Sequence, residues 1–252
     1  MRLLPRLIVV ALVASLLLSA PYVAVVQAAI ARADAQRLES YPGSTCSGTT
    51  TYTCTNIDVG SGTDRALILA FGIPTSDLLT GATFNGDAMT CPAGARIGDA
   101  GDRWVGLCYL LNPASGAHDL VISTSSNVDV KTNYVLVYTG VGSVEDEDEI
   151  SNAGTTTLNR TLSTSANSVL VAYLRESAGG AVTWTNGITT EIASSGGAHV
   201  ADSAGVTISA GTTTVTATMG TSNVTALTTL SLAEPAAAGG TKKLLLLGVG
   251  ER

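Results

Sequence analysis

The sequence predicts an all-β protein of antiparallel sheets packed as a sandwich, in two similar halves, preceded by a hydrophobic N-terminal helix. Short apolar runs rich in β-forming residues are separated by Gly, Asn, Ser and Pro, and each run is too short for an ordinary helix. Only 13% of the 252 residues are charged and 4% are aromatic, so Val, Leu, Ile and Ala must form the core. The same order of strand patterns occurs twice, about one hundred residues apart.

The N-terminal residues 1–33 have the pattern of a signal peptide. Arg2 and Arg6 precede an apolar run at 7–20, and small residues follow Pro21. Cleavage after Ala28 or Ala33 fits this pattern. A retained membrane anchor is the alternative, because the apolar stretch approaches the ~20 residues that span a bilayer. Residues 34–48 are expected to form a linker that begins with a helical turn.

The four cysteines predict disulfides and an exported protein. Cys46, Cys54, Cys91 and Cys108 form an even set without the Cys-x-x-Cys spacing of metal sites. Of the three possible pairings, Cys46–Cys54 and Cys91–Cys108 join sequence neighbours and are favoured. In the chain-entropy description, each would contribute about 2.5–3 kcal/mol to stability.

The first β half is expected at 49–144 and the second at 155–235, joined by an acidic linker at 145–154. Buried strands are predicted where the sequence is continuously apolar, and Asn85-Gly86 predicts a tight hairpin. The predicted buried strands are 66–71, 105–111, 134–138 and 169–174.

The internal repeat pairs 65–71 with 168–174, each followed by an aromatic residue and an Asn-Gly turn. Further along, 116–123 corresponds to 211–218, and each half closes on a hydrophobic strand, 134–138 or 227–232. Two arrangements are open: the halves can form two layers of one sandwich or two tandem small sandwiches.

Four segments carry a resemblance to a known family. Residues 64–69, 83–90, 109–118 and 137–141 resemble β-sandwich modules of large bacterial extracellular, adhesin-type proteins and of phage or prophage structural proteins. The resemblance spans 56–235. It implies a jelly-roll-like sandwich used for display or adhesion, and it implies no catalytic residue.

The C-terminal residues 236–252 are expected to be a flexible linker followed by a Leu-rich strand. Leu244, Leu245, Leu246 and Leu247 would be an aggregation hazard if they were exposed without a partner. The strand is therefore expected either to fold back on its own sheet or to pair with a neighbouring subunit. Other copies of the chain are the partners that this pattern predicts.

The residues that could support chemistry are few. A net charge of −7 without a basic cluster argues against nucleic acid as a partner. His118 is expected in a turn entering a strand and His199 in an exposed Gly-rich loop, and no Gly-x-Ser-x-Gly motif occurs. The acidic run 145–149 is expected to be a solvated linker, with calcium binding as the alternative and no other cofactor expected.

The predicted function is structural. We expect an exported surface-display protein that contributes to an extracellular assembly, adhesion or a virion through protein–protein contacts, without catalysis. A carbohydrate-binding module with Trp104, Trp184 or Tyr109 as stacking platforms is the first alternative. An exported hydrolase is the second.

Overall fold

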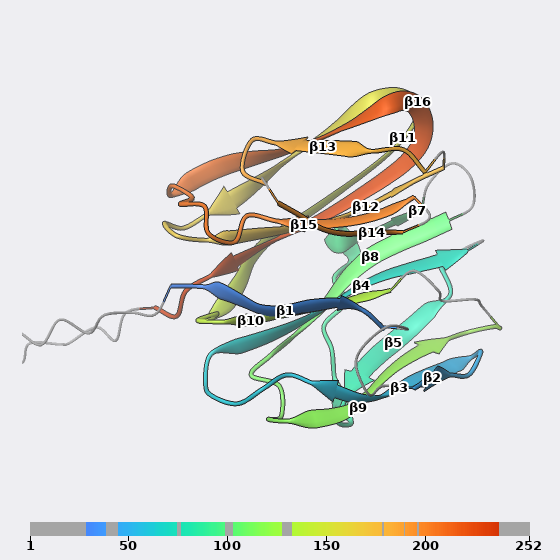
Figure 1. Ribbon diagram of the computed structural model, residues 1–252, viewed down its shortest axis with the longest axis vertical. Coiled ribbons are helices and arrows are strands. Elements are labelled where there is room, and N and C mark those ends of the chain that lie inside the picture. The colour runs from blue at the N-terminus through green and yellow to red at the C-terminus, as the bar shows by residue number, and fades with distance from the viewer. Residues whose placement is uncertain are drawn as a thin grey trace, which may run out of the picture.

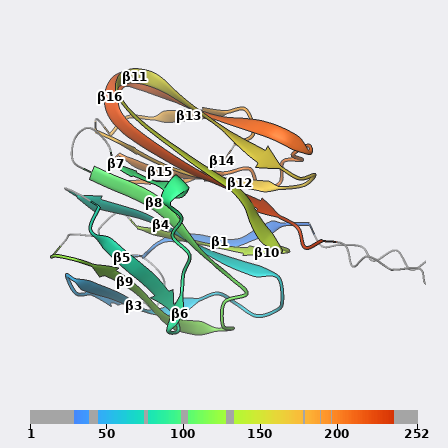
Figure 2. The same cartoon turned by 180° about the vertical axis from the view of Figure 1, so that it is seen from behind.

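The computed structural model of the protein describes residues 29–38, 45–74, 77–98, 103–127, 133–177, 179–188, 190–195 and 197–236. This part of the chain is all-β, and every pairing between its strands is antiparallel, as predicted. Two halves are stacked one above the other (Figures 1 and 2).

The first half consists of two five-stranded sheets. The inner sheet has the order β1-β10-β4-β8-β7, and the outer sheet has the order β2-β3-β9-β5-β6. A 3-10 turn, η2 (Ala93–Ala95), precedes β7. The strands are β1 (Ala31–Arg37), β2 (Cys46–Ser47), β3 (Thr51–Asp58), β4 (Arg65–Pro74), β5 (Leu79–Phe84), β6 (Asp87–Ala88), β7 (Arg96–Gly98), β8 (Arg103–Leu111), β9 (Ala117–Thr124) and β10 (Tyr134–Thr139).

The second half is one six-stranded sheet that curves into a nearly closed barrel. Two long strands, β11 and β16, pair along most of their length and bend over the other strands (Figure 1). The order is β11-β16-β12-β15-β14, and β13 pairs with β16 as well. The strands are β11 (Ser143–Thr164), β12 (Val169–Glu176), β13 (Val182–Thr185), β14 (Thr190–Ser195), β15 (Ala198–Asp202) and β16 (Gly211–Ala233).

The same strand pairings occur in both halves. In the first, β4 pairs with β10 and β8, while β9 pairs with β3 and β5. In the second, β12 pairs with the end of β16 and with β15, while the start of β16 pairs with β11 and β13. Strands that are separated by loops in the first half are continuous in the second. The repeat in the sequence therefore corresponds to two tandem units of equivalent connectivity.

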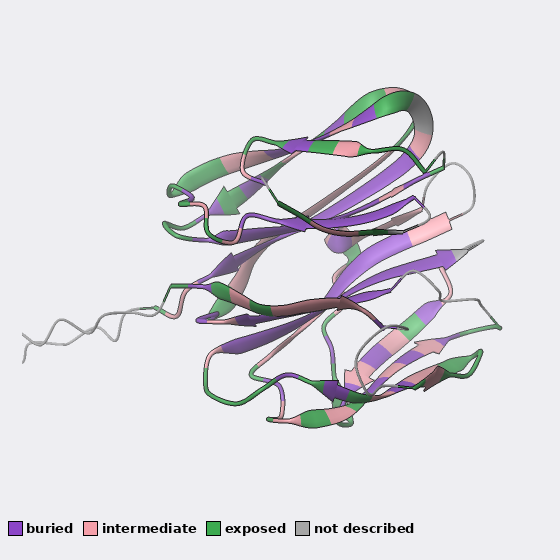
Figure 3. Ribbon diagram, in the orientation of Figure 1, coloured by how far each residue is buried: buried purple, intermediate pink, exposed green. Residues whose placement is uncertain are grey.

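The two units pack back to back. Along β4, residues 67, 69 and 71 face the core between the sheets of the first half, whereas 66, 68 and 70 face the second half. Along β12, residues 170, 172 and 174 face the internal core of the second half, whereas 169, 171 and 173 face the first half. Both faces of these central strands are thus buried (Figure 3), which explains their continuous apolar sequences.

The inner layers of the two units run in opposite strand order. Strand β1 of the first half lies against β14 of the second, and β7 and η2 lie against β11 at the other side. Strand β1 is equivalent to the start of β11, and β7 is equivalent to β14. The two inner layers are therefore related to each other by an approximate twofold axis. It has the self-complementary form of a homodimer interface within one chain.

The linker boundaries were wrong. Asp34 to Arg37, expected in a linker, belong to β1, because they pair with β10 at the edge of the inner sheet. The acidic residues 145–154, also expected as a linker, lie inside β11 and pair with β16. The hydrophobic N-terminal segment, expected at 1–33, lies outside the described residues over 1–28, and its residues 31–33 belong to β1. No described helix is long and apolar enough to cross a membrane.

The predicted disulfides and hairpin are confirmed. Cys46–Cys54 joins β2 to β3, and Cys91–Cys108 ties the segment before η2 to β8. Two disulfides indicate an oxidising environment of the extracellular type. Asn85 and Gly86 have φ angles of 52° and 83° between β5 and β6, as a type I′ hairpin requires.

Candidate functional site

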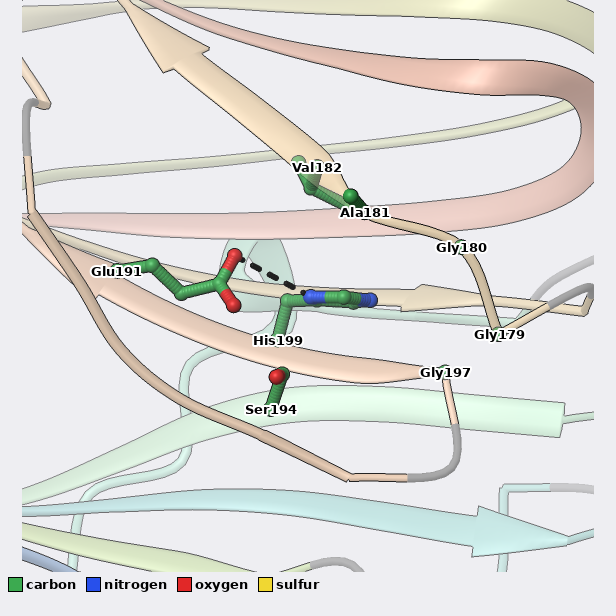
Figure 4. Close-up of a pocket in the computed structure, with 8 residues that line it drawn as sticks. All are labelled: Gly179, Gly180, Ala181, Val182, Glu191, Ser194, Gly197 and His199. Carbon is green, nitrogen blue, oxygen red and sulfur yellow. Dashed lines mark hydrogen bonds and ion pairs between the residues drawn. The ribbon is translucent and has the colours of Figure 1, made fainter.

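A polar pocket of about 530 Å³ lies in the second half, between the start of β13 and the β14–β15 hairpin (Figure 4). Its volume lies within the range of small-molecule sites. Its walls combine a carboxylate, an imidazole and a hydroxyl with a Gly-rich segment. The lining residues are Gly179, Gly180, Ala181, Val182, Glu191, Ser194, Gly197 and His199.

His199 is placed between two carboxylates. It lies on β15 opposite Ser194 of β14, and it is only 4% exposed. Its Nδ1 is 3.3 Å from Oε2 of Glu191, and its Nε2 is 3.7 Å from Oε1 of Glu176. Both ring nitrogens therefore face acidic groups.

The backbone at the end of β12 fixes this arrangement. The amide of Glu176 donates to the carbonyl of Gly197 at 2.7 Å. Gly197 has a φ of +80°, and a Cβ there would lie 2.3 Å from the carbonyl oxygen of Glu176. Only glycine fits this close approach, which brings the turn before β15 against the buried Glu176.

Glu191 reaches the pocket from β14. A bulge between Glu191 and Ala193 interrupts the pairing of β14 with β15 and redirects the side chain. The Oε2 atom of Glu191 accepts a hydrogen bond of 3.2 Å from Nε1 of Trp184. The same oxygen lies near Nδ1 of His199. Figure 4 shows the carboxylate directed at the imidazole ring. The side chain is 31% exposed, so solvent reaches it.

His199 and Ser194 do not form a nucleophile–base pair in this geometry. A serine nucleophile needs a base within hydrogen-bond reach, but both nitrogens of His199 face carboxylates rather than Ser194. The two carboxylates lie at opposite ring nitrogens and do not converge on one point. Among the described residues, no three His, Cys, Asp or Glu side chains are grouped to hold a metal ion.

His199 was misplaced by the sequence prediction. It is a buried strand residue instead of a member of an exposed loop. Neither Glu176 nor Glu191 was linked to it, because the three residues lie on different strands. One signal was available in the sequence: Glu176 stands at the end of an apolar strand. A carboxylate is seldom buried without a partner, so this position indicates a paired acidic side chain. His118 lies at the start of β9, with Nε2 2.9 Å from the carbonyl oxygen of Ser115.

The two tryptophans predicted as platforms differ in exposure. Trp184 is 8% exposed and belongs to the internal core of the second half, so little of its indole faces solvent. Trp104 is half-buried and packs against the first core, with its indole against Gly98. Leu244 to Leu247, the other predicted interaction residues, lie outside the described residues.

Part of the acidic run is used within the second half. Glu145 accepts hydrogen bonds from Ser165, from Ser168 at 2.7 Å and from Ser231 at 3.3 Å. Burial by itself raises the pKa of Glu145, but these hydrogen bonds outweigh it and hold the pKa below its usual value. Asp148 lies 3.6 Å from Arg160. The run is therefore a structural strand segment, and calcium binding there stays a prediction.

A buried ionic network joins the two halves. Asp202 of β15 is fully buried and accepts hydrogen bonds of 2.8 Å from Arg32 of β1 and from Tyr138 of β10. The amide of Ala204 donates to it at 3.2 Å. Burial and the adjacent Asp202 charge raise the pKa of Tyr138 well above its usual value, so the phenol stays neutral.

Comparison with known proteins identifies no family for this sequence. Neither a protein-family model nor a curated protein matches the sequence.

Proposed function

We propose that the protein is an exported structural module that acts through protein–protein contacts and has no catalytic activity. Each half is proposed to be a jelly-roll-like sandwich. Support for this fold comes from the pairing order, in which β1, β4, β8 and β10 lie in one sheet and β3, β5, β6 and β9 in the other. In this arrangement, the chain crosses repeatedly from one layer to the other, and among the described strands only β2–β3, β5–β6 and β7–β8 are consecutive strands of the same layer.

The observation that carries the proposal is an uncharged, hydroxyl-rich face on the outer side of the second half. We call it the threonine face. Its central rows run across three paired strands, so the hydroxyls lie side by side on a continuous sheet. Its exposed or partly exposed residues are Thr157, Thr218 and Thr183 in one row, Asn159 and Thr185 on either side of the buried Thr216 in the next, and Thr161 beside Thr214.

The position of the chain ends also supports display. Ala31 pairs with Thr139 and Ser143 pairs with Ala233, so both described ends lie at the same side of the molecule (Figure 1). A tether or an assembly contact at this side leaves the outer sheets free. The described chain ends at residue 236 on this side, and the apolar run 244–247, which comes later in the sequence, is the proposed assembly segment.

Light scattering after size exclusion tests this role on the mature exported chain. We expect a defined oligomer, and we expect deletion of 241–252 to convert it to monomer. A double variant, Thr161→Lys with Thr214→Lys, tests the threonine face by placing two like charges at paired positions. The proposal would be contradicted if the mature chain without the deletion were monomeric at all concentrations. It would also be contradicted if neither the deletion nor the double Lys variant affected the oligomer.

A second candidate function is the binding of a small cationic ligand in the pocket. Glu191 is fixed by Trp184 and His199, and Glu176 lies behind the imidazole. No Lys or Arg is among the described residues that line the pocket. Carboxylates held in this way favour an ammonium or guanidinium group. Glu191 would be the main contact of the ligand.

Fluorescence of Trp184 provides the test, because its indole donates to Glu191. In a Trp104→Phe background, Trp184 is the only tryptophan. We expect n-butylammonium chloride to change its emission saturably, and Glu191→Gln to abolish the change. An equal response to sodium chloride, or an unchanged response in the Glu191→Gln variant, would exclude this function.

A further inference from the structure

The described chain before Asp34 is part of the folded core. Ile30 is 6% exposed and packs in the cluster between the two halves. Ala31 and Arg32 pair with Thr139 and Tyr138 of β10. These residues therefore belong to the folded protein, although they fall inside the segment that has the pattern of an export signal.

Arg32 connects β1 to the second half. Its Nη1 lies 2.8 Å from Oδ1 of Asp202, whose side chain is fully buried. Without Arg32, this carboxylate would keep the Tyr138 hydroxyl and the Ala204 amide as its partners among the described residues. A buried charge that loses its counterion strongly destabilises a fold.

The two candidate cleavage positions consequently give different products. Cleavage after Ala33 would remove Ile30 and Arg32, and would create a charged amino group inside β1. Cleavage after Ala28 would keep both residues. The new amino group would then be on Ala29, which is exposed and precedes the strand. A solvated terminal charge carries no burial cost.

We infer that the export signal is removed by hydrolysis of the Ala28–Ala29 peptide bond, so that the mature chain begins at Ala29. Water supplies the atoms for the carboxylate of Ala28 and the amino group of Ala29. The peptidase is of the class that requires a small residue before the cut. This inference rests on the proposed export, and it selects the less obvious site over Ala31-Arg32-Ala33.

Expression of the full chain in a secreting host, followed by intact-mass measurement and N-terminal sequencing of the exported protein, tests the inference. An N-terminus at Ala29 is expected. An exported chain that begins at Asp34 would overturn the cleavage site but leave the proposed export intact. A chain that stays uncleaved and unexported would overturn both.

A pair of matched variants locates the cut independently of stability. Ala28→Leu removes the small residue before the proposed bond, and we expect unprocessed precursor to accumulate. Ala33→Leu removes the small residue at the alternative site, and its position in β1 is exposed, so the fold tolerates the larger side chain. We expect normal processing of Ala33→Leu. The reverse pattern of processing would refute the inference.

Discussion

At the residue scale, buried polar side chains hold segments that are far apart in the sequence. Arg65 is 4% exposed and connects two loops near the start of β4. Its guanidinium donates to backbone carbonyls and to one hydroxyl. The acceptors are the carbonyl oxygens of Val59, Gly60, Gly62 and Pro113 and the Oγ of Ser115. The sequence indicates a strand start here but does not identify these acceptors.

Glu145 gives a prediction about pH. Its pKa is lowered in the fold, so its stabilising contribution is present above the ordinary pKa of 4.5 and is lost as pH falls through the folded pKa. We expect Glu145→Gln to reduce the free energy of unfolding by about 1 kcal/mol at pH 7, since partial exposure weakens these charged hydrogen bonds. Urea titrations at pH 7 and pH 3 measure the free energy of unfolding of the wild type and of the Glu145→Gln variant. We expect the difference between the two proteins to be smaller at pH 3.

Glu149 is the matched control because its pKa shift has the opposite sign. Burial and the neighbouring Asp148 raise its pKa in the fold. Ionisation of Glu149 therefore lowers stability as pH rises above 4.5. Glu149→Gln should be neutral or stabilising at pH 7. If both variants lost the same free energy of unfolding at pH 7, and this loss were unchanged at pH 3, the role assigned to Glu145 would be contradicted.

At the element scale, the strands that were predicted are those whose local sequence decides their structure. Continuous apolar runs predicted β4, β10 and β12, and Asn85-Gly86 predicted the β5–β6 hairpin. These signals depend on side-chain periodicity and on turn backbone angles, both of which are local. The disulfide pairing was equally accessible, because each bond joins sequence neighbours.

Strand β1 and the acidic first part of β11, which were not predicted as strands, form by pairing with distant partners. The sequence of β1 alternates Ala with Arg, Asp and Gln, and it becomes a strand because β10 offers an edge. The run of acidic residues in β11 avoids strong repulsion because Glu145 and Asp146 bind Ser and backbone donors, and Asp148 faces Arg160. A charge run was read as a solvated linker because its neutralising partners are distant in the sequence.

At the scale of the whole molecule, the shared interface predicts that the two halves unfold together. Ile68 of β4 and Val171 of β12 are fully buried in the cluster between the halves. We expect wild-type protein to show one calorimetric transition. The Ile68→Ala change alone should weaken the interface by about 2–5 kcal/mol. We expect the double variant, Ile68→Ala with Val171→Ala, to separate the calorimetric transitions of the two halves.

The control for this experiment uses adjacent positions on the same strands. Leu69 and Leu170 are also fully buried, but they face the internal cores of the first and second halves. Leu69→Ala with Leu170→Ala should lower the melting temperature and keep a single transition. Two transitions in the wild type, or a single transition in the interface variant, would show that the interface does not couple the halves.

The sequence by itself determined the β class, the main buried strands, the disulfides, the hairpin and the duplication, because each depends on local periodicity, turn chemistry or short spacing. Only the tertiary structure decided that the halves stack back to back, that β1 completes the inner sheet and that His199 lies between Glu176 and Glu191. These features arise where strands distant in the sequence meet. Their partners are selected by packing, charge and hydrogen bonding across the folded chain, which a pattern read along the sequence does not contain.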